Sequence, residues 1–191
     1  MIQNRKDIYM KKHITKFTIL KALSFLPALL VMSMIFSFSA QDSGESSSLS
    51  EQVAFYVIDC IDKLLNLDLT VLQSTQAVEQ IHTFIRKVGH FGEYMLLGIT
   101  ISLPLYTLYR VRGKRLFFIA LCFCALFASS DEIHQLFVDG RAGSPKDVLI
   151  DSLGAFTGII STQLLCYILR KCITEPLQLH HCTASKCTQK M

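Results

Sequence analysis

Charged residues are scarce in this sequence of 191 residues, of which they make up 18%. Soluble domains average about 25%, so the apolar residues of this chain must cluster. Hydrophobic residues make up 51%, which excludes intrinsic disorder, and their long runs exclude a disulfide-rich scaffold. At this length we expect one domain, without room for a membrane anchor and a separate large enzyme. A membrane protein is the class that remains.

The charged residues are also unevenly distributed along the sequence. Although the formal net charge is only +4, the basic residues gather in separate segments, which argues against a nucleic-acid-binding surface. Internal and inverted repeats are both missing from the pattern. We therefore expect no nucleic-acid partner, and a lipid bilayer as the main surroundings of the chain.

Four apolar stretches are candidates for membrane-spanning helices, because about 20 helical residues cross a hydrocarbon core of about 30 Å. They are residues 22–40, 88–109, 116–137 and 148–169. The apolar run of the third stretch ends at Ser130, so this stretch is long enough to cross the membrane only if its helix continues through Asp131 to Phe137. A buried soluble helix is the alternative for the third stretch. A cleaved signal peptide is the alternative for the first, although its apolar run exceeds the usual 7–15 residues or so.

Basic residues indicate the orientation of these spans. Fourteen of the 19 lie in residues 1–21, 110–115 and 170–191. The sequence therefore predicts an all-α fold, a four-span transmembrane helix bundle with both termini in the cytoplasm, as a multi-pass protein of the cell membrane. We divide it into a basic N-terminal segment (1–21), a membrane domain (22–169) with an outer loop (41–87), and a cytoplasmic tail (170–191).

The outer loop is the sizeable extramembrane segment. It opens with a serine-rich stretch, residues 43–50, that we expect to be flexible. Apolar residues then recur at helical spacing from Val53 to Leu65, which predicts an amphipathic helix on the membrane or on the bundle. Residues 65–71 alternate like a strand, so the end of that helix is left open. Cys60 is the loop's one cysteine and has no partner there for an intrachain disulfide.

Polar residues gather at the outer ends of three predicted spans. Arg86, His90 and Glu93 share one helical face, and Asp131, His134 and Gln135 share another. The fourth span begins at residues 144–147 and carries Asp151 one turn deeper. An unpaired ionisable group at membrane depth costs at least about 2.5 kcal/mol, so these side chains should face one another or a water-filled cavity.

Each of these residues also has a purely structural interpretation. Ser144, Pro145 and Asp147 are typical of a helix start. Arg141 could simply neutralise Asp131 or Glu132, and Arg86 could anchor its helix at the interface. Gly154 and Gly158 form a G-x-x-x-G pattern that we interpret as helix packing.

The segments with these residues resemble the VanZ family. The resemblance rests on IRKVGHFGEY (85–94), SDEIHQLF (130–137) and GRAGSPKDVLIDSLG (140–154), with FSFSAQ (36–41) similar to the end of that family's first helix. It implies a cell-envelope membrane protein associated with low-level teicoplanin resistance, and it assigns no catalytic roles. The family's motif residues correspond here to Arg86, His90, Glu93, Tyr94, Asp131, Glu132, His134, Gln135, Arg141, Asp147 and Asp151.

Three functions stay open at this point. The first is a protein that limits the action of lipid-anchored glycopeptides at the outer leaflet. The second is an intramembrane enzyme that acts on a lipid-linked cell-wall precursor through the histidines and carboxylates. The third is a small transporter or proton relay, which would need a homo-oligomer to enclose a path.

We expect no cofactor. A divalent metal held by His90, Glu93, Asp131 and His134 is the alternative. The tail offers a second alternative, with His180, His181, Cys182 and Cys187, but their spacing fits no common zinc pattern. A solvated, partly disordered tail is the interpretation we prefer.

Overall fold

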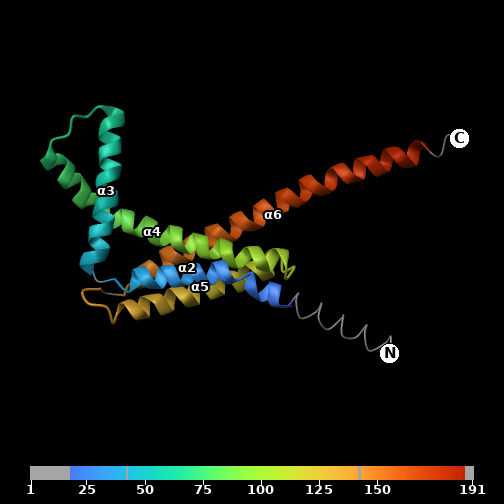
Figure 1. The fold of residues 1–191 in the computed structure, drawn as a ribbon, viewed down its shortest axis with the longest axis horizontal. Helices are drawn as coiled ribbons and strands as arrows, with labels where there is room; N and C mark the ends of the chain where they lie inside the picture. Colours follow the sequence, from blue (N-terminus) through green and yellow to red (C-terminus); the bar gives the residue numbers. More distant parts are fainter. Residues whose placement is uncertain (1–17, 42, 142, 188–191) are drawn as a thin grey trace.

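The computed structural model describes residues 18–41, 43–141 and 143–187, and this part of the chain is helical without any strand (Figure 1). The helices are α2 (Leu26–Ser39), α3 (Ser43–Leu65), α4 (Val71–Thr107), α5 (Gly113–Gln135) and α6 (Pro145–Cys187). Helices α2, α4, α5 and α6 run along the long axis, and α3 stands across one end of them. The predicted all-α fold is confirmed.

Three of the helical segments are long and apolar enough to cross a membrane: Thr18–Ser39, Gly113–Gln135 and Pro145–Cys172. The third predicted span continues as a helix past Ser130, as its length required, and ends at Gln135. Helix α4 contains residues 88–107 of the second predicted span, 88–109, but it is not among the three segments that are apolar enough to cross a membrane. His90 and Glu93 interrupt its apolar run, and Pro104 lies inside its last turns.

Local sequence signals account for several helix ends. Pro27 occupies the first turn of α2, where a missing N–H costs no helical hydrogen bond. The amide of Lys146 donates to Oγ of Ser144 at 3.2 Å, so Ser144 caps α6 and the predicted helix start is confirmed. At the start of α4, the Gln73 amide donates to Oγ1 of Thr70, and the Thr70 amide donates to Oε1 of Gln73.

In the outer loop one expectation is wrong, and a boundary that the sequence left open is settled. The serine-rich stretch is not a flexible segment, because α3 begins at Ser43 and includes it. Residues 65–71 form no strand: Asn66 and Asp68 have φ angles of 48° and 51°, a left-handed conformation that breaks an extended run. Helix α4 then starts at Val71, ten residues before the expected return to helix at Ile81. The loop is therefore a helical hairpin formed by α3 and the first turns of α4.

The tail also differs from the expectation. Helix α6 continues to Cys187, where the sequence predicted partial disorder, and it extends well beyond the other helices (Figure 1). At about 1.5 Å per residue its 43 residues span about 65 Å, roughly twice the thickness of a hydrocarbon core. A large part of α6 therefore lies outside any membrane that the bundle crosses.

Close packing of α4 on α6 forms the centre of the bundle. Gly154 lies against the carbonyl oxygen of Phe91 and Gly158 against that of Met95, with no room for a side chain at either glycine. Gly98 meets the backbone of Ala155 in the same way. The interpretation of the G-x-x-x-G pattern as packing is confirmed. Buried apolar residues surround this contact: Ile35, Leu97, Leu116, Ala155 and Ile159.

The outer surface of the helices is apolar, as expected for contact with lipid. Leu30 on α2, Phe118 and Leu126 on α5, and Leu164 and Leu165 on α6 are all more than half exposed. Buried core residues thus lie on the inside of the bundle and large apolar residues also cover its outside. This arrangement is typical of a helix bundle whose solvent is a bilayer.

Candidate functional site

The predicted site residues lie at one end of the bundle, where α2 and α5 end, α6 begins, and α3 crosses. The turn between α4 and α5 lies at the opposite end (Figure 1). That opposite end carries basic side chains, with Nζ of Lys21 5.1 Å above the ring of Tyr109. The bundle therefore has a basic end and an end where acids, histidines and arginines meet.

Asp131 is the centre of a buried polar cluster that joins α2 to α5. The Ser39 hydroxyl donates to its Oδ2 at 2.7 Å, and Nε2 of Gln135 contacts the same oxygen at 3.3 Å. Gln135 also donates to Oγ of Ser39 at 3.2 Å. Asp131 and Ser39 are fully buried. The cluster therefore fixes the C-terminal end of α2 on α5.

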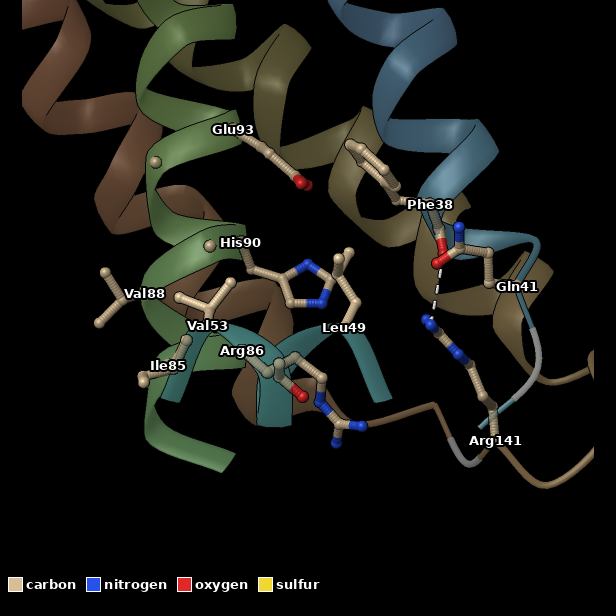
Figure 2. A pocket seen from close by; sticks show the side chains of 13 residues that line it. Phe38, Gln41, Leu49, Val53, Ile85, Arg86, Val88, His90, Glu93 and Arg141 are labelled. Carbon is tan, nitrogen blue, oxygen red and sulfur yellow. Dashed lines mark hydrogen bonds between the residues drawn. The ribbon is translucent and has the colours of Figure 1, made fainter. Parts of the chain in front are cut away.

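Glu132 and Arg141 hold the connection between α5 and α6. Oε2 of Glu132 accepts a hydrogen bond from the backbone amide of Ser144 at 2.7 Å, and a guanidinium nitrogen of Arg141 donates to the carbonyl oxygen of Phe38 at 3.3 Å. Gly143 lies against the carbonyl of Glu132, which leaves too little space for a side chain. Arg141 thus turns toward the end of α2 (Figure 2).

Two contacts link α4 to α6 at this end. Nζ of Lys87 lies 3.6 Å from Oδ1 of Asp147, and both side chains are partly exposed. One turn deeper, Nδ1 of His90 lies 3.9 Å from Oδ1 of Asp151, which is fully buried. Neither carboxyl oxygen of Asp151 has a hydrogen-bond partner among the described residues. The His90 imidazole thus faces a buried acid.

His134 and Tyr94 are among the predicted site residues that line neither of the pockets at this end. The His134 ring stacks on Phe36, with ring centroids 4.3 Å apart and an interplanar angle of 21°. Tyr94 is fully buried beside Phe127, and its hydroxyl has no hydrogen-bond partner within the described part of the chain. Both side chains pack between helices, so the geometry gives them a structural role.

Two adjoining pockets open at this end of the bundle, and Asp131, Glu132 and Asp151 line neither of them. The larger, of about 380 Å³, lies between the end of α2, the first turns of α3 and the middle of α4, with Arg141 on its rim. The smaller, of about 210 Å³, lies between α4 and the loop that leads into α6. Arg86, His90 and Arg141 line both pockets. In Figure 2 the side chains of Glu93, His90 and Arg86 point into the larger pocket from successive turns of α4.

The structure adds residues that the sequence argument did not select. Ser39 and Phe36 belong to the FSFSAQ segment, but nothing in their spacing indicated that they contact Asp131 and His134. Lys87, which directly follows Arg86, was not among the predicted site residues, but it faces Asp147. Leu49 and Val53 of α3 line the larger pocket, a position that depends on how α3 folds across the bundle.

The described residues contain no group of three histidine, cysteine, aspartate or glutamate side chains arranged to hold a metal ion. The alternative that combined His90, Glu93, Asp131 and His134 therefore finds no support in the geometry. Asp131 is turned toward Ser39, and His134 is stacked on Phe36. The side chains of His180, His181, Cys182 and Cys187 lie outside the described residues.

Substitution of Ser39 by alanine tests the Asp131 cluster. We expect Ser39→Ala to lower the free energy of unfolding by about 1–3 kcal/mol, because a buried carboxyl loses its shortest hydrogen bond. Ser37→Ala is the matched control, since the Ser37 hydroxyl is exposed and bonds only to Ser33 of its own helix. Melting temperatures in detergent measure both. Equal shifts for the two variants would contradict a stabilising role for the cluster.

Comparison with known proteins agrees with this architecture. The chain matches no curated protein and no solved structure significantly. A protein-family model described as VanZ/LLP1 matches residues 24–170. The match includes α2 to α5, the pockets and the described contacts between α4 and α6. The chain therefore belongs to the VanZ/LLP1 family.

Proposed function

We propose that the bundle crosses the cell membrane four times, with α4 as the additional span and both termini in the cytoplasm. The uneven distribution of basic residues supports this topology, because residues 110–115 and Lys21 lie at the end opposite the pockets. The polar residues of α4 face α6 and the pockets, which reduces the cost of placing them in a span. In this proposal residues 1–21 and 170–191 flank a membrane domain of residues 22–169.

Cysteine labelling in intact cells tests the topology. Cys60 on α3 and Cys172 near the far end of the α6 span are both exposed. In single-cysteine variants, a membrane-impermeant maleimide is expected to label Cys60 in intact cells and Cys172 only after permeabilisation. Labelling of Cys172 in intact cells, with Cys60 protected, would invert the topology and place the pockets in the cytoplasm.

The function we propose is binding of an envelope amphiphile at the outer face, through which the protein limits the action of teicoplanin-type glycopeptides. One observation carries it: the larger pocket combines an apolar wall with Arg86, His90 and Arg141 at the end of the membrane helices. A site with apolar and charged walls side by side suits a ligand with the same two parts. Family membership supports the link to glycopeptides.

Deletion of the gene, followed by measurement of teicoplanin and vancomycin susceptibility, tests this function. We expect susceptibility to teicoplanin to rise, wild type to restore resistance, and Arg86→Gln to fail to restore it. Lys63→Gln is the matched control, because Lys63 is an exposed cation on α3 that pairs with Asp59 away from the pockets. Immunoblotting of membranes verifies equal amounts of protein. Unchanged susceptibility after deletion would contradict the proposal.

A second candidate, an intramembrane enzyme for a lipid-linked precursor, is favoured by the position of His90. Its ring lines both pockets while Nδ1 faces Asp151, an arrangement in which an acid can orient a histidine as a proton acceptor. Accumulation of a precursor in the deletion strain, reversed by wild type but not by His90→Gln, would favour the enzyme. No observation favours the transporter.

A further inference from the structure

The junction of the two pockets carries a more specific inference, which rests on the proposed binding of an amphiphile. We propose that Arg86, His90 and Arg141 bind the phosphate group of a membrane lipid, and that the chain of this lipid lies along the apolar wall formed by α3 and α4. The inference names the chemical class of the ligand: a lipid whose headgroup is attached through phosphate.

The first argument is the arrangement of the basic side chains. The three residues that line both pockets come from two separate elements, with Arg86 and His90 on α4 and Arg141 on the loop before α6. Figure 2 shows the Arg86 and Arg141 side chains entering the same space from different elements. Arginine presents several N–H donors in a planar fork that matches the oxygens of a phosphate.

The second argument is that most nearby acids already have partners in the structure. Asp131 bonds to Ser39 and Gln135, Glu132 accepts from the Ser144 amide, and Asp147 faces Lys87. Arg86 forms no ion pair with any described residue. The acids therefore hold the helices together, while Arg86 gives the junction a positive charge.

Glu93 also lines the larger pocket, and its position is compatible with an anion at the arginines. It lies seven residues after Arg86 on α4, which corresponds to a rise of about 10 Å along the helix. Figure 2 shows its carboxyl group and the Arg86 guanidinium at opposite ends of the pocket. A phosphate bound between Arg86 and Arg141 is thereby separated from this carboxyl group.

The third argument is the apolar wall. Leu49 and Val53 of α3 and Ile85 and Val88 of α4 line the larger pocket beside the basic residues. Leu49, Val53 and Val88 are each more than 40% exposed. Inorganic phosphate has no apolar part that could contact these side chains, whereas a lipid chain would bury them. The position at the ends of α2 and α5, where headgroups lie in the proposed topology, agrees with a lipid as the source of the phosphate.

Thermal unfolding of the full-length protein in detergent micelles tests the inference with three probes. They are dioleoyl phosphatidic acid, dioleoylglycerol with the same chains but no phosphate, and inorganic phosphate. We expect phosphatidic acid to raise the melting temperature in a saturable manner, and the other two probes to leave it unchanged. Arg86→Gln should weaken the apparent affinity at least about tenfold, since a charge-assisted hydrogen bond is lost.

Two further variants make the result decisive. Lys63→Gln removes one positive charge outside the pockets and should bind like wild type. Leu49→Gln should weaken binding while leaving the arginines in place. Equal stabilisation by dioleoylglycerol, equal stabilisation by inorganic phosphate, or unchanged affinity in Arg86→Gln would each overturn the inference. Susceptibility to glycopeptides is measured separately in cells, so failure of the proposed function and failure of this inference are distinguishable.

Discussion

Gly158→Ala is expected to disrupt the contact between α4 and α6. A Cβ atom at Gly158 would meet the backbone oxygen of Met95 and lie close to the backbone nitrogen of Ile99, and backbone atoms cannot rotate out of the way. The two helices would have to move apart along their closest contact. Overpacking of a tight core costs about 1–3 kcal/mol and occasionally more, and we expect a loss of at least about 3 kcal/mol in free energy of unfolding.

Gly89→Ala is the matched control for this substitution. It makes the same chemical change on α4, but no heavy atom lies within 4 Å of the added Cβ. Alanine is a better helix former than glycine by up to about 1 kcal/mol, so this variant should melt at the same or a higher temperature. Melting temperature and resistance to SDS measure both variants. Similar behaviour of Gly158→Ala and Gly89→Ala would show that the helices are not packed as described.

His90→Leu is expected to produce the second large effect, by removing the imidazole that faces Asp151. Asp151 is fully buried, and Nδ1 of His90 lies 3.9 Å from its Oδ1. Breaking a buried pair by removing one partner costs about 3–5 kcal/mol, because the other group stays buried without compensation. The variant should therefore be strongly destabilised in detergent, as measured by thermal or SDS unfolding.

A second substitution in the same background separates this effect from lost packing. Asp151→Asn replaces the buried acid with a neutral amide of nearly the same size, so the double variant should recover much of the stability that His90→Leu loses. The control pair is Lys87 and Asp147, which joins the same two helices but is 45% and 33% exposed. Lys87→Gln should change stability by less than about 1 kcal/mol. Additive losses in the double variant would contradict a coupling between His90 and Asp151.

Hydropathy and helical spacing were sufficient to predict the helices of the bundle. The third predicted span shows why: its apolar run ended at Ser130, and only a continued helix through Asp131 could give the necessary length. The serine-rich stretch was predicted wrongly, and the sequence left the end of the following helix open at residues 65–71. Composition indicated flexibility in the first segment, and alternation made the helix boundary ambiguous in the second. The packing of α3 against α4 and the left-handed turn at Asn66 and Asp68 decided both.

From the sequence, the candidate site could be predicted only as a group of residues at the same end of the membrane-spanning helices. Helical spacing placed Arg86, His90 and Glu93 on one face, and the structure directs all three into one pocket. The same reasoning placed His134 with Asp131, although His134 stacks on Phe36 instead. Spacing along a helix specifies which side chains share a face, but it contains no information about which neighbouring helix that face meets.

The sequence by itself determined the all-helical membrane class, the G-x-x-x-G packing and the residues that gather at one end of the helices. These properties depend on the length of apolar runs, on periodicity and on small side chains, all of which are local. Only the tertiary structure decided that Ser39 bonds to Asp131, that Lys87 faces Asp147, and that α3 closes one side of the pocket. Those contacts join residues far apart in the chain, so they depend on the angles at which whole helices pack.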